Sequence, residues 1–268
     1  MRLARSAVAS LVLAVALFFG WVAVTAYLFE QSFFAPGRFA NATEAALSSP
    51  TVRSSIAKAL TMAAYGSTGA YSQSAADQVT TALQAALLNK AVQQEFATAM
   101  DNAQKHIIGL YPGDVTFGGP VLANAVAENL LAVNPQLASL ISQQGSTLQV
   151  SIPGTTLPDL GKLYRNIGAI ERDALLLAVG LALISLLIAP KRSTILTEIG
   201  IWLVVMSFVE ALLFWIVPTV VIPLTNASWA PVVSQVLRAI GGPAISTYAA
   251  LLVGGGVFIV LGRVFRRA

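Results

Sequence analysis

The sequence contains no cysteine and only one histidine, His106, among its 268 residues. The absence of cysteine excludes disulfide bonds, thiolate metal sites and a cysteine nucleophile, and a single histidine excludes a metal site built on a histidine pair. Charged residues are also scarce, at 10%, whereas hydrophobic residues make up 56%. This composition lies outside the usual range of soluble domains and favours a membrane protein.

Motifs for catalysis are missing as well. The serine-containing stretch "GSTGAYS" has neither the G-x-S-x-G elbow nor the S-x-x-K spacing of a serine nucleophile. The run Gly254, Gly255 and Gly256 lies in an apolar segment without a following lysine, so it does not match a phosphate-binding loop. We therefore expect a non-enzymatic protein that holds no metal and no cofactor.

Four apolar runs are present, at residues 7–28, 174–189, 199–217 and 243–262. A helix needs about 20 apolar residues to cross a hydrocarbon core of about 30 Å, and the second run is slightly short. The first run could also be a cleaved signal peptide, but such peptides have an apolar core of about 7–15 residues. Its greater length favours a retained signal anchor.

The distribution of basic residues predicts the orientation of these spans. If all four runs cross the membrane, the basic clusters fall on one side, which the positive-inside rule assigns to the cytoplasm. These clusters are Arg2 and Arg5, then Lys191 and Arg192, then Arg263, Arg266 and Arg267. Both termini are thus predicted to be cytoplasmic in a bacterial plasma membrane. Because the basic excess sits at these ends, the net charge of +4 does not imply nucleic-acid binding.

The resulting fold class is a membrane all-α protein in three parts. Residues 1–28 form the anchor, residues 29–173 form a mostly helical extracytoplasmic domain, and residues 174–268 form a three-helix membrane domain with a basic cytoplasmic tail. Pro50 suits the first turn of a helix, and Asn134-Pro135 is predicted to be the boundary between two helices. The stretches "DVTFG" and "TLQVSIPG" alternate and read as short strands, which allow a small two-stranded sheet without requiring it.

Four short motifs, in their order along the chain, resemble the layout of a known group of proteins. They are "LSSPTVRSSIAKAL" after the first span, "FATAMDNAQKHIIG", "DVTFGGPVL", and the basic turn "APKRS" after the second span. With these features the chain resembles a group of uncharacterised actinobacterial membrane proteins that have four spans and a large extracytoplasmic loop domain. The resemblance implies this layout and no particular activity.

Two polar residues are candidates for function. Glu210 interrupts the third apolar run, in "SFVEALLFW", and an ionised carboxylate in lipid is costly. We expect Glu210 to face the other helices in its protonated form, at the depth of the glycine run. There it acts either as a hydrogen-bonding contact between helices or as a proton relay, and the first role is favoured. For His106, in the outer domain, a hydrogen-bonded structural role is favoured over that of a catalytic base.

Small residues predict where helices pack closely. They are Gly254, Gly255 and Gly256 in the fourth run, and Ala174, Ala178 and Ala182 in the second. The leading functional hypothesis is an accessory or scaffolding subunit of an envelope complex. In this hypothesis the protein binds the lipid bilayer and a protein partner. The alternative is a small proton-coupled transporter that uses Glu210.

Overall fold

The computed structural model describes residues 2–65, 73–143, 148–224, 230–242 and 244–267. The chain divides into two compact units. Unit 1 comprises residues 1–35, 163–217 and 241–268, and unit 2 comprises residues 36–162 and 218–240. In the described ranges the chain is predominantly helical and contains one two-stranded sheet. The predicted helical fold with a small sheet is therefore confirmed.

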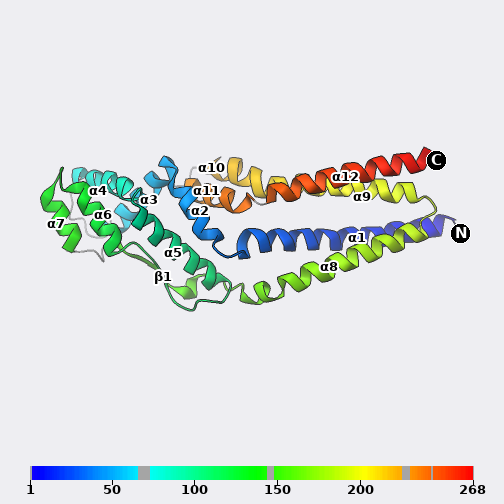
Figure 1. Ribbon diagram of the computed structural model, residues 1–268, viewed down its shortest axis with the longest axis horizontal. Coiled ribbons are helices and arrows are strands. Elements are labelled where there is room, and N and C mark those ends of the chain that lie inside the picture. The colour runs from blue at the N-terminus through cyan, green and yellow to red at the C-terminus, as the bar shows by residue number, and fades with distance from the viewer. Residues whose placement is uncertain (1, 66–72, 144–147, 225–229, 243, 268) are drawn as a thin grey trace. The chain divides into compact units, whose positions relative to one another are not determined.

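Unit 1 is built from four long helices (Figure 1). They are α1 (Arg2–Phe29), α8 (Gly161–Ile188), α9 (Arg192–Ala211) and α12 (Ala244–Arg267). The first continues into a π-helical segment, η1 (Glu30–Phe34), and α9 continues into a second one, η4 (Leu212–Val221), which contains Pro218.

Among the described residues, three helical segments are long and apolar enough to cross a membrane. These segments are Ala4–Phe34, Arg192–Val221 and Ala244–Arg266. The predicted second span, in α8, is not one of them. Its apolar part follows Glu171, Arg172 and Asp173 directly, and the helix ends at Ile188. Three candidate spans are thus present, and a fourth in α8 stays a prediction.

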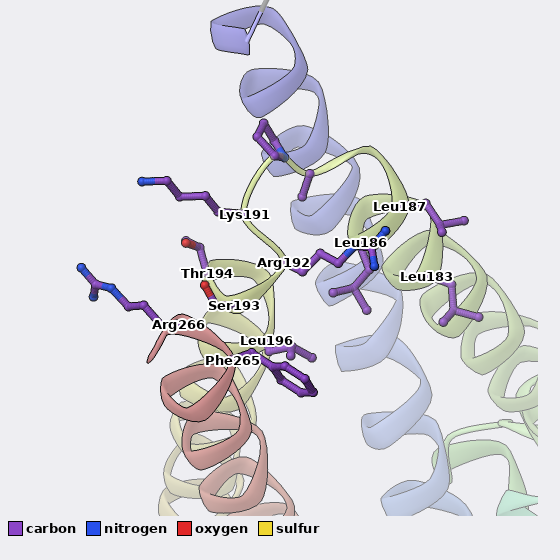
Figure 2. A pocket seen from close by; sticks show the side chains of 12 residues that line it. Leu183, Leu186, Leu187, Lys191, Arg192, Ser193, Thr194, Leu196, Phe265 and Arg266 are labelled. Carbon is purple, nitrogen blue, oxygen red and sulfur yellow. The ribbon is translucent and has the colours of Figure 1, made fainter. Parts of the chain in front are cut away.

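Small and hydroxylated side chains hold the helices of unit 1 together. The hydroxyl of Ser185 in α8 donates to the backbone oxygen of Ala9 in α1 over 2.9 Å. Gly20 of α1 lies directly under the ring of Trp202 in α9. Lys191 lies in the short turn between α8 and α9, and Arg192 is the first residue of α9. The end of α12 lies beside the start of α9 (Figure 2).

Unit 2 combines residues 36–162, which form six α-helices and the sheet in their described part, with a separate later segment, residues 218–240. The helices are α2 (Arg38–Leu47), α3 (Pro50–Tyr65), α4 (Gln73–Ala86), α5 (Lys90–Ile107), α6 (Pro120–Leu130) and α7 (Pro135–Gln143). The short helix η3 (Gly154–Thr156) follows the sheet, and the later segment contributes α10 (Ile222–Leu224) and most of α11 (Ala230–Gly241). Helices α3 and α7 begin at Pro50 and Pro135, as the sequence predicts.

The sheet pairs two strands that are far apart in the sequence. Strands β1 (Val115–Phe117) and β2 (Val150–Ile152) run antiparallel, with Val115 opposite Ile152. Gly118 ends β1 with a φ of +75°, and a Cβ at this position would collide with the backbone oxygen of Leu148. The sharp exit from β1 thus requires glycine.

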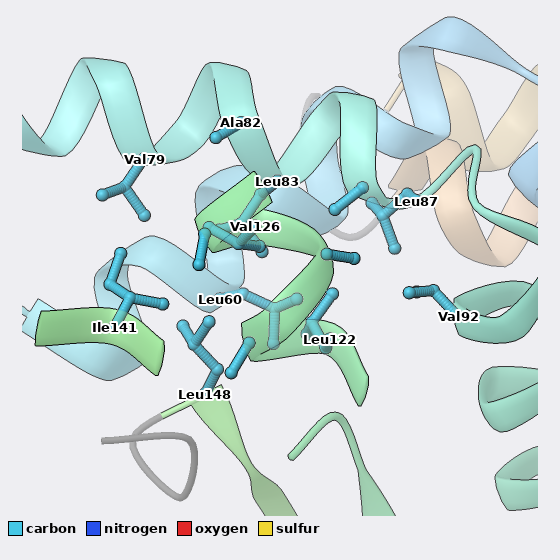
Figure 3. Packing of buried hydrophobic residues seen from close by; sticks show 14 of the residues in the cluster. Leu60, Val79, Ala82, Leu83, Leu87, Val92, Leu122, Val126, Ile141 and Leu148 are labelled. Atoms are coloured by element: carbon cyan, nitrogen blue, oxygen red, sulfur yellow. The ribbon is translucent and has the colours of Figure 1, made fainter. Parts of the chain in front are cut away.

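The core of unit 2 is formed by aliphatic side chains from several helices (Figure 3). Leu83 and Leu87 of α4 meet Leu122 and Val126 of α6, and Leu148 closes the cluster next to the sheet. All five side chains are fully or almost fully buried. Unit 2 therefore has a hydrophobic core of its own, which is the property that allows a segment to fold as a domain.

Candidate functional site

Glu210 occupies the last turn of α9, immediately before the helix changes to the wider π-helical turns of η4. Its side chain is only 1% exposed. The hydroxyl of Thr25, on α1, donates to Oε1 of Glu210 over 3.3 Å. The carboxyl group thus lies between helices and not on their exposed surface.

Tyr248 of α12 completes the group from a third helix. The hydroxyl of Ser207, one turn before Glu210, donates to the backbone oxygen of Tyr248 over 3.0 Å. The Tyr248 phenol lies within electrostatic reach of the Glu210 carboxyl. In the described part of the chain, Oε2 of Glu210 and the Tyr248 hydroxyl are both buried without a hydrogen-bond partner.

Apolar side chains surround this polar group. Leu28 of α1, Ala244 and Tyr248 of α12 form a buried cluster, and Val24 and Ala211 pack against it. In such an environment an unpaired charge is costly. The group thus brings together side chains of three helices, with a hydrogen bond from Thr25 to the carboxyl and one from Ser207 to the backbone of Tyr248.

The predicted depth of Glu210 is wrong. Gly255 lies against Gly200 of α9, and Ser207 reaches Tyr248, so the antiparallel register places Glu210 near the start of α12 and not near the glycine run. The prediction counted the depth of Glu210 along its helix from Thr194 and set that depth against the glycine run. The helices are instead aligned by their ends, because Gly262 lies against Ser193 and α12 continues to Arg267.

The small residues of the predicted packing sites differ in how closely other helices approach them. A Cβ on Gly255 would meet the Gly200 backbone oxygen at 2.7 Å, whereas a Cβ on Gly254 or Gly256 would meet nothing within 4 Å. In α8, Ala174 is buried, and Ala178 and Ala182 are half-buried. Close helix approach therefore involves one glycine of the run.

His106 lies in the last turn of α5, half-buried against Gly154 in η3. A Cβ on Gly154 would come within 2.5 Å of Cε1 of the imidazole. The Nδ1 atom of His106 is buried and has no hydrogen-bond partner among the described residues. The backbone nitrogen of Gly154 donates instead to Oδ1 of Asp114. The histidine thus packs under a glycine at the end of the sheet.

Two other acidic residues are partly buried, and no sequence motif identifies them. Burial, with the neighbouring Glu30 carboxylate and a hydrogen bond between the two side chains, raises the pKa of Glu171 in α8. Burial also raises the pKa of Glu95 in α5, whose Oε2 atom has no partner in the described ranges. Within the residues that the structure describes, no three His, Cys, Asp or Glu side chains are grouped closely enough to hold a metal ion.

Comparison with protein-family models, with curated proteins and with solved structures finds no match to this chain. The resemblance to four-span actinobacterial proteins therefore stays a prediction.

Proposed function

We propose that the protein is a non-enzymatic, multi-pass protein of a bacterial plasma membrane whose unit 2 lies outside and binds a protein partner. In this proposal α8 is the fourth span, and both termini are cytoplasmic. The partner belongs to an envelope complex in which the chain is an accessory or scaffolding subunit. Support comes from a feature of unit 2 that its own folding does not require.

That feature is the turn between α6 and α7, which exposes two aliphatic side chains. Leu131 is 58% exposed and Val133 is 65% exposed. The turn is fixed in position, because the Asn134 amide donates to Oε1 of Gln78 in α4 over 3.1 Å. Exposed apolar side chains on a fixed turn give an anchor for a partner at little entropic cost.

A cleft of about 600 Å³ adjoins this turn. Polar side chains of α4, among them Asp77 and Thr81, line one side of the cleft, and Asn129 of α6 lines the other. Val133 lines the same cleft. We call Leu131, Val133 and this cleft the α6–α7 rim. An apolar anchor beside hydrogen-bonding groups suits the surface of another protein.

The test is affinity purification of the full chain in a mild detergent. The wild type should recover a partner in stoichiometric amount. Changing both Leu131 and Val133 to Asp should remove that partner, because a buried, unpaired charge strongly opposes binding. Leu88→Asp is the matched control, since Leu88 is 55% exposed in the turn after α4 and does not line the cleft. Recovery of the wild-type chain alone would count against the proposal.

The proposed orientation predicts which segments a protease can reach. Protease added to intact spheroplasts should cut between residues 29 and 173 and leave a tag placed after Ala268 intact. The reason is that the basic clusters hold the opposite helix ends in the cytoplasm. Immunoblots for the tag and for unit 2 distinguish the two ends, and a tag that is digested from outside would overturn the orientation.

A second candidate function is a proton-coupled transporter. It is favoured by one observation, namely that the buried Glu210 and Tyr248 each keep an oxygen atom without a hydrogen-bond partner among the described residues. A carboxyl group inside a membrane is often part of a proton path. A structural contact between helices accounts for the same burial with fewer requirements.

Two substitutions separate these roles. Glu210→Gln keeps a hydrogen-bonding side chain of the same size but cannot titrate, and Glu210→Leu removes both properties. If the contact is structural, Gln should preserve folding in detergent and partner binding, whereas Leu should lower the thermal midpoint. A correctly folded Gln variant that has lost function would instead show that the carboxyl titrates, and the transporter would become the leading candidate.

A further inference from the structure

A cavity of about 1260 Å³ lies at one end of unit 1. It is bounded by the end of α8, the α8–α9 turn, the start of α9 and the end of α12 (Figure 2). In the proposed orientation this end faces the cytoplasm. It is separate from Glu210, which lies in the last turn of α9.

The charges at this cavity have one sign. Lys191, Arg192 and Arg266 line it, and no acidic side chain does. In the part of the chain that the structure describes, none of the three forms an ion pair. The start of α9 adds to the positive potential, because its first turn contains no acidic residue and no side chain caps it.

Arg192 differs from the other two cations in its surroundings. Figure 2 shows its guanidinium extending toward Leu186 of α8, whereas Lys191 and Arg266 extend to the opposite side. Exposed apolar side chains continue the wall of the cavity, among them Leu187, which is 75% exposed, and Phe265. A guanidinium without a carboxylate partner thus lies beside an apolar surface.

We propose that this cavity binds an anionic phospholipid, with Arg192 on the phosphate and the leucines of α8 along an acyl chain. The planar guanidinium can donate two parallel hydrogen bonds to phosphate oxygens. The apolar wall favours a lipid over free phosphate, because a small soluble anion buries no apolar surface there. Basic pockets between membrane helices are suited to such headgroups. The inference goes beyond the proposed function and does not depend on the outer partner.

The test uses the full chain in a neutral detergent and native mass spectrometry. Phosphatidylglycerol and phosphatidylcholine with identical acyl chains are titrated in parallel, with inorganic phosphate as the competitor. The wild type should bind phosphatidylglycerol more tightly by about tenfold, because the choline cation of phosphatidylcholine offsets the charge of its phosphate. Arg192→Gln should lower the affinity for phosphatidylglycerol by about tenfold and reduce that preference, since a charge-assisted hydrogen bond contributes this much. Lys191→Gln removes the same charge from the neighbouring residue and should reduce the preference far less.

Each other outcome overturns the assignment. If Lys191 and Arg192 only set the orientation of the helices in the membrane, the two residues are equivalent. Equal losses of phosphatidylglycerol binding in both Gln variants would therefore contradict a defined site. Full displacement of the lipid by millimolar phosphate, without a preference for phosphatidylglycerol, would identify a free-anion site. Arg192→Lys covers the case in which the Gln variant does not fold. Arg192→Lys keeps the positive charge but loses the planar guanidinium that donates two parallel hydrogen bonds. Unchanged binding of both lipids by this variant would contradict the role of the guanidinium.

Discussion

Replacing Gly255 with valine should disrupt the packing of α9 against α12. The two backbones touch at this point, because a Cβ on Gly255 would meet the Gly200 oxygen at 2.7 Å and Cγ2 of Val204 at 2.8 Å. Gly200 has the reciprocal constraint, since its Cβ would meet the Gly255 oxygen at 2.6 Å. A backbone oxygen cannot move aside without moving its helix, so overpacking of about 1–3 kcal/mol or more is expected.

The adjacent glycines provide matched controls for this experiment. A Cβ on Gly254 or Gly256 would meet nothing within 4 Å, so Gly254→Val and Gly256→Val add the same volume without a collision. Thermal unfolding in detergent, followed by size-exclusion chromatography, should show a lower midpoint for Gly255→Val alone. Equal losses in all three variants would contradict the register of α9 and α12 described above.

Replacing Leu122 with alanine should destabilise unit 2 by about 2–5 kcal/mol, the range for a large-to-small change at a fully buried site. Leu122 is 0% exposed and lies in the core between α4 and α6. A domain is stable by about 5–15 kcal/mol, so this loss is a large fraction of the total. Amide hydrogen exchange of the full chain in detergent should therefore accelerate throughout α4 and α6.

The preceding residue is the control for this change. Val121 is 42% exposed, and Val121→Ala should alter the free energy of unfolding by no more than about 0.5 kcal/mol. If Leu122→Ala leaves exchange in α4 unchanged while it accelerates exchange in α6, the two helices do not share the core that the structure gives them.

Local features of the fold could be predicted from the sequence. Proline fixes the starts of α3 and α7, because Pro50 and Pro135 lack a backbone N–H that the first turn of a helix does not use. The alternating β-branched stretches correspond to β1 and β2. These signals depend on neighbouring residues only, so one sequence is sufficient to find them.

Relations between distant segments could not be predicted in the same way. The position of Glu210 against Tyr248 depends on where α12 begins relative to α9, and apolar composition does not fix that register. Thr25 and Ser207 were missed as neighbours of this site, although each is a hydroxyl residue within an apolar run. The grouping of residues 218–240 with unit 2 likewise depends on tertiary contacts.

The most direct test of the proposed function is photo-crosslinking in intact cells at the α6–α7 rim. A photoreactive phenylalanine analogue is incorporated at position 133 in one variant and at position 88 in another. Both positions are exposed, but only position 133 belongs to the rim. The proposal predicts a specific crosslink to one envelope protein from position 133 and none from position 88. Absence of a protein crosslink from position 133, in a correctly inserted chain, would contradict a partner-binding function for this surface.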